Sequence, residues 1–559
     1  MDLIYVSYNS EKWIDGCFDS LMKSEYNLKD IFVYVVDNAS KDNTVKKLEE
    51  KKGKIEGQLG AFEIIRSTEN LGFGKANNLG FSKGNSEIVC FFNIDTEVFP
   101  DTLTKLEKEI YASNEDVGLW ELRQFPYEHP KKYDILTGYT SWCSGAAFAM
   151  KRELYARIGG FDERIFMYAE DVDLSWRIRS LGYKLRYVPK ATLIHYSYEN
   201  AGEVKPNQYI NSIINNLLLR YRFGTLGNVV KGHMMFWGHL LKHRSIFPKA
   251  RRILLKRYIA HFKDIPHFMK WRNQEGNTVK GVSKFAGWDY EMIRDGAFHK
   301  NERPETNPLV SIIVRTCNRP KVLRECLISL RHQTYENIEI VVVEDGKNTA
   351  EEMIREEFSD LNIIYQSTGK NVGRSKAGNT AMSLAHGKYL NFLDDDDMFY
   401  ADHVETLVRG IERSNNRAIY STAFEVETTV ESKDPYVYTE YDYKGVHKQP
   451  FSRPLLYHHN YIPIQCIMFE KTLFDELGGQ DERLDALEDW DMWVRYATKT
   501  DFDFIFKTTS LYRVPYQKDV NAQRQKALDD ALVIVREKHS TYETKLSVKD
   551  VVEMMKYQF

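Results

Sequence analysis

The sequence has little of what marks a secreted, membrane-spanning or nucleic-acid-binding protein. Its 559 residues include only six cysteines and no Cys-x-x-Cys pair, so we expect reduced, buried thiols in a cytosolic protein. No signal peptide opens the chain, and no run of roughly 18 apolar residues predicts a spanning helix. The net charge of −3 at pH 7 is close to neutral for this length and argues against nucleic-acid binding.

The remaining composition is that of a folded protein. Hydrophobic residues make up 43% and charged residues 28% of the chain, which excludes a disordered protein. At roughly 100–200 residues per domain, the length predicts two to four domains. The aromatic share of 13% suits a core, and it also suits surfaces that stack on sugars.

An internal repeat decides the domain organisation. Residues 1–200 and 308–515 carry six landmarks in the same order, which chance does not explain. The pairs are 6–9 with 314–318, 35–38 with 342–346, 70–78 with 371–379, 92–95 with 393–396, 159–164 with 478–483, and 170–173 with 488–491. We therefore predict two related domains.

The spacing of the repeat predicts an α/β fold. Short β-branched runs alternate with helical patterns such as 320–331, which is typical of βαβ units in a mostly parallel sheet. The polar landmarks fall at carboxyl ends of strands, where such sheets bind ligands. The predicted domains are 1–225, a basic helical linker over 226–305, a second domain over 306–520, and a helical tail over 521–559.

The third strand of each copy ends in acids. In the second copy four consecutive aspartates, 394–397, follow an apolar strand. Like charges at a buried strand end repel, and a divalent cation such as Mg²⁺ or Mn²⁺ relieves that repulsion. A solvated acidic turn or a helix N-cap is the alternative. The first copy keeps only Asp95, with Asn93 where the second has an aspartate.

Each copy also has an acidic pair at the start of a helical pattern. These pairs are Glu170-Asp171 and Glu488-Asp489. Carboxylates at a helix start are often only caps. Because both pairs follow a metal-type strand, they are also candidates for the base that deprotonates an acceptor hydroxyl, and we favour Asp171 and Asp489.

Together these landmarks resemble the family 2 glycosyltransferases, which have the GT-A fold, over about three-quarters of the chain. The resemblance implies an inverting, metal-dependent transfer from a nucleotide sugar, with Mg²⁺ or Mn²⁺ as cofactor. It implies that nucleotide or diphosphate contacts Tyr8, Asn9, Asp37, Asn38, Asn70 and Lys75 in the first copy, and Thr316, Asn318, Glu344, Asp345, Asn371 and Lys376 in the second. It implies metal ligation by Asp95, Asp394 and Asp396.

The first copy bears a narrower likeness. Its stretches 144–147, 159–164 and 168–174 resemble bacterial rhamnosyltransferases and related galactofuranosyltransferases of cell-envelope glycans. In that group a histidine completes the metal site, which implies this role for His195, although a lone histidine after a strand is more often structural. The second copy has Arg513 in this region and lacks the histidine, so we expect Arg513 to contact phosphate.

The segment 242–272 is basic, with Asp264 as its one acid. Apolar and aromatic side chains are interleaved with the charges, which favours either a membrane-surface segment or a linker helix with solvated charges. The basic residues are Lys242, Arg244, Lys249, Arg251, Arg252, Lys256, Arg257, Lys263, Lys270 and Arg272. A lipid-linked acceptor would favour the membrane surface, on its cytoplasmic face.

Our leading hypothesis is a bifunctional transferase that uses dTDP- or UDP-linked donors, rhamnose or a related sugar for the first domain, to build a cell-surface polysaccharide. The alternative is one catalytic domain beside a domain that only binds acceptor or scaffolds assembly. A nucleotidyltransferase is a third class, but it would need a glycine-rich loop at the first strand, and neither 7–9 nor 316–318 offers one.

Overall fold

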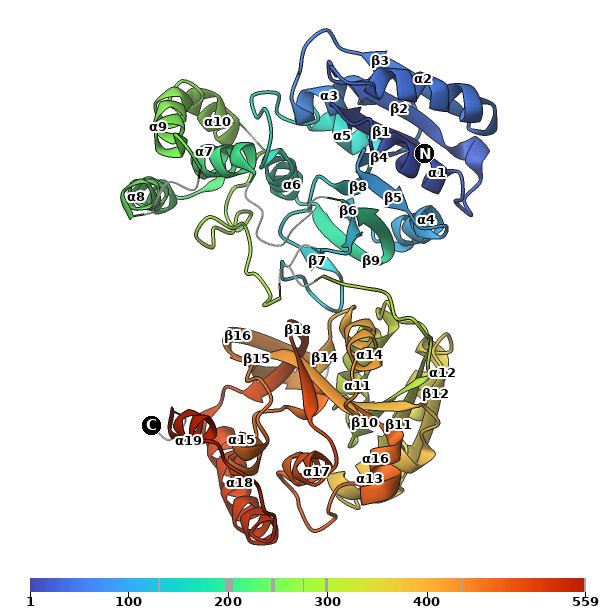
Figure 1. Cartoon of the computed structure of the whole chain (residues 1–559), viewed down its shortest axis with the longest axis vertical. Helices are drawn as coiled ribbons and strands as arrows, with labels where there is room; N and C mark the ends of the chain where they lie inside the picture. The colour runs from blue at the N-terminus through green and yellow to red at the C-terminus, as the bar shows by residue number, and fades with distance from the viewer. Residues whose placement is uncertain are drawn as a thin grey trace. The chain divides into compact units, whose positions relative to one another are not determined.

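A computed structural model describes residues 1–128, 131–196, 205–242, 247–274, 276–296, 300–433 and 436–556. The chain forms two compact units, Met1–Lys300 and Asn301–Phe559, and each is an α/β domain built on one sheet (Figure 1). The predicted fold class, two domains of this kind with helices between them and at the C-terminal end, is confirmed.

The sheet of the first unit has nine strands in the order β3-β2-β1-β4-β8-β6-β9-β5, with β7 on β9. The strands are β1 (Asp2–Ser7), β2 (Phe32–Asp37), β3 (Ala61–Arg66), β4 (Ile88–Asn93), β5 (Thr96–Val98), β6 (Val117–Phe125), β7 (Tyr139–Thr140), β8 (Ala147–Lys151) and β9 (Lys184–His195). β1 to β4 pair in parallel, whereas β8 runs antiparallel to both its neighbours. The sheet is thus mixed, where the sequence predicted mostly parallel strands.

The second sheet repeats this order as β12-β11-β10-β13-β17-β15-β18-β14, with β16 on β15. Its strands are β10 (Val310–Thr316), β11 (Ile338–Glu344), β12 (Ile363–Ser367), β13 (Tyr389–Phe392), β14 (Met398–Phe399), β15 (Ala418–Lys433), β16 (Tyr436–His447), β17 (Ile467–Glu470) and β18 (Phe502–Pro515). Ser7 pairs with Asp37 as Thr316 pairs with Glu344, so the landmarks of the repeat occupy equivalent positions.

Helices cover both faces of the first sheet. The side chains of β1 alternate between the faces: Leu3 packs in a core with α1 and α4, and Ile4 in a core with α5 and α6. The helices of this unit are α1 (Ile14–Leu21), α2 (Thr44–Ile55), α3 (Phe73–Phe81), α4 (Thr102–Ala112), α5 (Arg152–Arg157), α6 (Glu170–Ser180), α7 (Pro206–Phe223), α8 (Leu226–Lys242), α9 (Ala250–His261) and α10 (Ile265–Arg272). The short 3₁₀ helices are η1 (Leu28–Asp30) and η2 (Glu56–Gln58).

The second unit has the corresponding helices and two at its end. They are α11 (Pro320–Arg331), α12 (Glu351–Glu357), α13 (Arg374–Leu384), α14 (His403–Glu412), α15 (Arg453–His458), η3 (Ile464–Cys466), α16 (Lys471–Leu477), α17 (Glu488–Ala497), α18 (Lys518–His539) and α19 (Val548–Lys556). The acidic pairs open α6 and α17, directly after a left-handed residue, Ala169 (φ 69°) or Leu487 (φ 59°). This shared backbone turn starts both helices at the same landmark.

The predicted linker region, 226–305, does not stand apart as a separate body. The described residues of α8 to α10 belong to the first unit, and α18 and α19 belong to the second. The finer domain boundaries stay a prediction. Of the basic residues expected here, Arg244 lies outside the described residues, and Lys242 is described in its backbone only.

The cysteines form no disulfide, as expected, and five of the six are buried. In the ranges that the structure describes, every helix is too short or too polar to cross a membrane.

Candidate active sites

The strand-end residues Asn38 and Asp345 hold a glycine loop in each domain. The Asn38 side chain accepts from Leu71 N (2.7 Å) and donates to Gly72 O (3.2 Å). Asp345 accepts from Val372 N (2.6 Å) and Gly373 N (3.1 Å). In the first domain a Cβ on Gly72 (φ 81°) would lie 2.4 Å from Phe166 O, so this close approach requires glycine. This contact between the strand end and the glycine loop explains why these two landmarks of the repeat recur together.

The neighbouring residues Asp37 and Glu344 are buried and are bound to their own loops. Asp37 accepts from Ser7 Oγ (3.3 Å) and Ser40 N (3.2 Å), and Glu344 accepts from Thr349 N (2.9 Å) and Ala350 N (3.1 Å). Their carboxylates fix the loops beside the first strand.

An asparagine with a left-handed backbone conformation follows the first strand of each sheet. These asparagines are Asn9 (φ 51°) and Asn318 (φ 52°). Each Oδ1 accepts a backbone N–H from the loop after the second strand, Lys41 N (2.8 Å) or Lys347 N (3.1 Å). Nucleotide contacts by Asn9, Asn318 and their exposed neighbour Tyr8 stay predictions.

A cavity of about 530 Å³ lies in the first unit and contains four predicted site residues, Asp95, Glu170, Asp171 and His195. Lys75 and Asn70 are not among its lining residues, and Lys75 is exposed. The cavity therefore gathers the predicted metal ligands and the predicted base, while the diphosphate contacts of the glycine loop stay predictions, as do those of Asn371 and Lys376 in the second domain.

In this cavity His195 is held by a partner that the sequence analysis missed. Its Nδ1 lies 2.7 Å from Gln124 Oε1, which can only accept, so Nδ1 carries the proton. Nε2 is then the lone-pair side, 3.4 Å from Asn93 Nδ2 and 3.5 Å from Asp95 Oδ1. Two electron-pair donors that face each other suit a cation.

In the acidic pair of the first domain Glu170 is buried and Asp171 is half-buried. Burial, and then repulsion from Asp171, raise the pKa of Glu170 well above its ordinary value. Burial also raises the pKa of Asp171, against the N–H groups of Gly145 (2.9 Å) and Val172 (2.8 Å), which stabilise its charge. A Cβ on Gly145 would lie 3.3 Å from Asp171 Cβ, a tight contact that glycine avoids.

A buried lysine borders the same cavity. Lys131 is ion-paired with Glu121 and donates to Trp142 O (2.5 Å). Its Nζ also lies 4.6 Å from the centre of the Trp142 ring. Trp142 meets Tyr290 edge to face at 6.0 Å, and Trp288 completes an aromatic side of the lining. Residues from the predicted linker thus help to build the first cavity.

The second cavity, about 310 Å³, is lined by arginines as well as aspartates. Arg315 binds Asp394 through two bonds of 2.7 Å and lies 2.9 Å from Glu488. Arg319 pairs with Asp395 and with Asp396 (3.3 Å). Asp394 is therefore neutralised from within the protein, and Asp396, 41% exposed, is the more open carboxylate.

The acidic pair of the second domain has its own partners. Burial, and then repulsion from Glu488, raise the pKa of Asp489 to about 7. Asp489 accepts from Asn460 Nδ2 (3.0 Å) and Trp490 N (2.7 Å). It is not among the residues that line the second cavity, whereas Asp171 lines the first.

The strand register places Tyr512 where the first domain has His195. In the first sheet Thr96 pairs with His195. In the second sheet Met398 directly follows the residue equivalent to Thr96 and pairs with Leu511. Because the strands are antiparallel, the residue after Leu511 takes the position of His195. Arg513 follows. Its guanidinium donates to Glu325 (3.0 Å), and its backbone N–H donates to Asp397 (3.0 Å). Arg513 lines the cavity, and its contact with phosphate stays a prediction.

In each domain a cation joins a buried aspartate of α6 or α17 to a second, partly buried aspartate. In the first domain Arg222 of α7 pairs with Asp173 of α6 and with Asp162 (2.6 Å). In the second, Lys538 of α18 lies 2.9 Å from both Asp491 and Asp481. The tail helix α18 therefore holds α17 as α7 holds α6.

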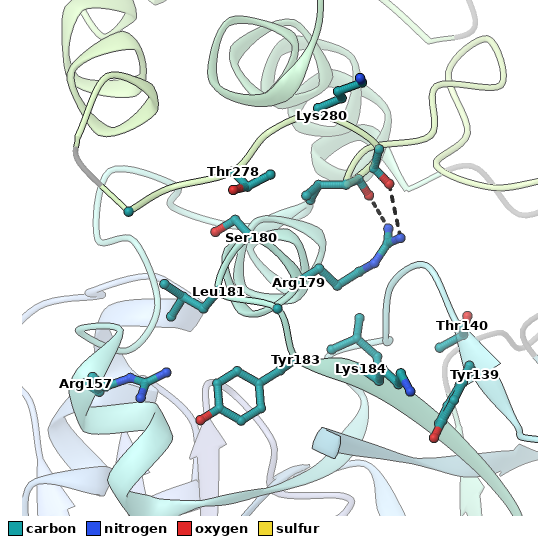
Figure 2. A pocket seen from close by; sticks show the side chains of 15 residues that line it. Tyr139, Thr140, Arg157, Arg179, Ser180, Leu181, Tyr183, Lys184, Thr278 and Lys280 are labelled. Atoms are coloured by element: carbon teal, nitrogen blue, oxygen red, sulfur yellow. Dashed lines mark hydrogen bonds between the residues drawn. The ribbon is translucent and has the colours of Figure 1, made fainter. Parts of the chain in front are cut away.

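A further hollow of about 680 Å³ lies at the C-terminal end of α6. Figure 2 shows Arg179 donating to the backbone of Gly281 and Val282, beside Arg157 and Tyr183. None of the predicted site residues lines this hollow, and Glu170 and Asp171 lie at the other end of the helix. It is therefore separate from the catalytic cavity.

Sequence reasoning missed Gln124, Lys131, Arg315, Arg319 and Asn460. Aligning the two copies could have drawn attention to Arg315, because the first copy has Val6 there. The others lie outside the repeated landmarks. In the described ranges no three His, Cys, Asp or Glu side chains are grouped to hold a metal by themselves.

Known proteins match both halves of the chain. Residues 2–168 and 311–477 each match the family described as Glycosyl transferase family 2. An uncharacterized glycosyltransferase of Rickettsia conorii is 30% identical over 544 residues, 92% of this chain and 79% of that protein. One of Methanocaldococcus jannaschii is 31% identical over 216 residues, 37% and 71% of the two chains. Several other relatives are matched over less than two-thirds of their length.

Among solved structures, a mannosyltransferase from Pyrobaculum calidifontis in complex with GDP-Man and Mn²⁺ is 18% identical, with a TM-score of 0.35. The match covers 49% of this chain and 87% of the other.

Proposed function

Because this chain belongs to glycosyl transferase family 2, with two modules in tandem, we propose that it transfers sugars from nucleotide-diphosphate donors onto a growing glycan, with inversion at the anomeric carbon. The observation that carries the proposal is the first cavity. There Asp95, His195 and Asp171 lie together beside an aromatic wall that suits a sugar ring.

The residues of the first cavity fit a divalent cation. Asp95 Oδ1 and His195 Nε2 face each other, and Gln124 orients the histidine so that its lone pair points to the carboxylate. Two protein ligands suffice for Mg²⁺ or Mn²⁺, because these ions commonly keep their remaining positions for substrate phosphates. When bound, the cation would stabilise negative charge on the departing diphosphate.

Asp171 is the proposed base. Burial raises its pKa above the ordinary value, which improves proton uptake, and the N–H groups of Gly145 and Val172 fix its direction. The acceptor hydroxyl gives its proton to Asp171 as its oxygen bonds to the anomeric carbon, and the bond from that carbon to the diphosphate oxygen breaks.

The donor and acceptor are proposed from the sequence likeness of the first module. We propose a dTDP- or UDP-linked donor carrying rhamnose or a related sugar, and a lipid-linked polysaccharide acceptor at the cytoplasmic face of the cell membrane. The stretches 144–147, 159–164 and 168–174 support this choice, and the aromatic side chains Trp142, Trp288 and Tyr290 would contact the acceptor.

The second module is proposed to be catalytic as well, with Asp489 as base and Asp396 as the open carboxylate. Arg315 and Arg319 already supply positive charge beside the aspartates, so this module would depend less on a metal. The alternative is a non-catalytic module that binds acceptor, and the absence of Asp489 from the lining of the second cavity favours this alternative.

A donor screen with the full chain tests the proposal. Nucleotide sugars are incubated with Mg²⁺ or Mn²⁺, and release of nucleoside diphosphate and transfer to a glycan acceptor are measured for the wild type, Asp171→Asn, Asp489→Asn and the double variant. We expect each single variant to lose one activity by about 10²- to 10⁴-fold. If Asp489→Asn changes nothing, the second module is not catalytic; consumption of no donor by the wild type would refute the proposal.

A further inference from the structure

Helix α8 exposes a row of large apolar side chains. Leu226, Val230, Met234, Trp237 and Leu241 are 80%, 50%, 70%, 42% and 74% exposed. Their spacing of three or four residues places them on one face of the helix. Soluble surfaces seldom expose so many apolar side chains in a row, and such patches mark a binding surface.

Helix α9 lies beside α8 and adds positive charge to this surface. The Phe236 and Tyr258 rings stack at 4.1 Å and join the two helices. α9 then exposes Ile259 (66%), and Phe262 just after it (48%). The exposed basic residues of this region are Lys249, Arg251, Arg252, Lys256, Arg257, Lys263 and Lys270. The one acid nearby, Asp264, is paired with Arg164 at 3.1 Å.

This two-helix surface is coupled to the catalytic cavity through α7. Gln208 and Ser212, in the first turns of α7, line the cavity. Further along α7, Tyr221 OH lies 2.8 Å from His233 Nε2 of α8, and Arg220 donates to Asn228 O (3.0 Å). A ligand held at α8 and α9 is therefore connected to the cavity by one packed helix.

We propose that α8 and α9 form a docking surface for an anionic lipid bilayer. Apolar side chains would enter the boundary between headgroups and acyl chains, with Trp237 at the polar interface, while the basic side chains meet lipid phosphates. A second copy of this chain is the less suitable occupant, because it would bring two basic surfaces together. The surface deepens the proposed function, since it would bring a lipid-linked acceptor to the first cavity.

Vesicle co-sedimentation of the full chain tests this docking, without donor or metal, so that failure here leaves the transfer reaction untouched. The vesicles are phosphatidylcholine alone or mixed with phosphatidylglycerol. We expect binding to the anionic vesicles, weakened by high salt. Met234→Gln with Leu241→Gln, and separately Lys256→Gln with Arg257→Gln, should each lower the partition coefficient about tenfold or more.

Val533→Gln with Ile534→Gln is the matched control, because these side chains of α18 are also exposed apolar residues (69% and 45%). We expect this variant to bind vesicles like the wild type. Circular dichroism shows whether each variant is folded. Equal sedimentation with neutral and anionic vesicles, or no sedimentation, would overturn the proposal. So would self-association of the wild type that Met234→Gln with Leu241→Gln abolishes, since the apolar row would then be an interface between copies.

Discussion

The two modules share a strand order and differ in how they balance charge at the same edge of the sheet. The first has neutral Val6 and Asn93 where the second has Arg315 and Asp394, an ion pair. The extra aspartate of the second module is thus matched by an extra arginine. The longer run of acids therefore does not by itself add net negative charge at this edge.

The difference continues at the histidine position. The first module places His195 and Gln124 beside Asp95, and the second places Tyr512 there, with a basic side chain, Arg513, next to it. The second module thus pairs its aspartates with arginines, whereas Asp95 of the first module faces a histidine. Two copies of one fold can keep the base and change the source of positive charge.

The largest effect should come from the cations that join two aspartates in each domain. Arg222→Met leaves Asp162 and Asp173 buried without their shared partner, which should cost roughly 3–5 kcal/mol. Lys538→Met should cost about 1 kcal/mol, because Lys538 is 28% exposed and water screens its charge. Hydrogen exchange of α6 and α17 in the full chain measures each loss. Equal losses would show that the two bridges are equivalent.

Removal of metal should separate the two modules next. Chelation should slow transfer by the first module by roughly 10²- to 10³-fold, because Asp95 and His195 face each other as its proposed metal ligands. The second module should lose much less, because Arg315 and Arg319 remain. The rates are measured in Asp489→Asn and Asp171→Asn chains, which isolate the modules. A second module that is equally sensitive to chelation would end this distinction.

A smaller effect should follow from Gln124. Gln124→Leu removes the acceptor that orients His195, and loss of such a partner typically weakens metal binding about 10- to 100-fold. Titration of Mn²⁺ monitored by calorimetry gives the affinity. Tyr512→Phe, at the position of His195 in the second module, is the control and should leave it unchanged. An unaltered affinity in Gln124→Leu would remove His195 from the proposed metal site.

The smallest effect concerns the pH profile of the second module. Asp489 must be a carboxylate to accept a proton, so kcat should fall as pH falls through its pKa of about 7. Asn460 donates to that carboxylate and lowers its pKa, so Asn460→Ala should move the midpoint of the profile to higher pH. Asn460→Ala should leave the pH profile of the first module unchanged, because Asp171 there accepts from the backbone N–H of Gly145. A midpoint that stays in place would argue against Asp489 as the base.

The sequence by itself determined the tandem organisation, the family and the candidate carboxylates, because these depend on local order along the chain. Both copies of the repeat carry acidic residues at the same landmarks, so Asp95, Asp171 and Asp489 could be identified as candidate site residues without coordinates. The period of the apolar residues also predicted two α/β domains.

Tertiary structure alone decided which side chains meet. Gln124 lies 71 residues from His195, and Asn460 lies 29 residues from Asp489. Lys131 lies 10 residues from Glu121, and no local pattern marks such partners. Folding also placed the predicted linker against the first cavity and gave the tail helix the role of α7. The sequence shows a run of four aspartates, but only folding brings Arg315, 79 residues earlier in the chain, against Asp394: the charge that reaches a buried carboxylate is set by packing.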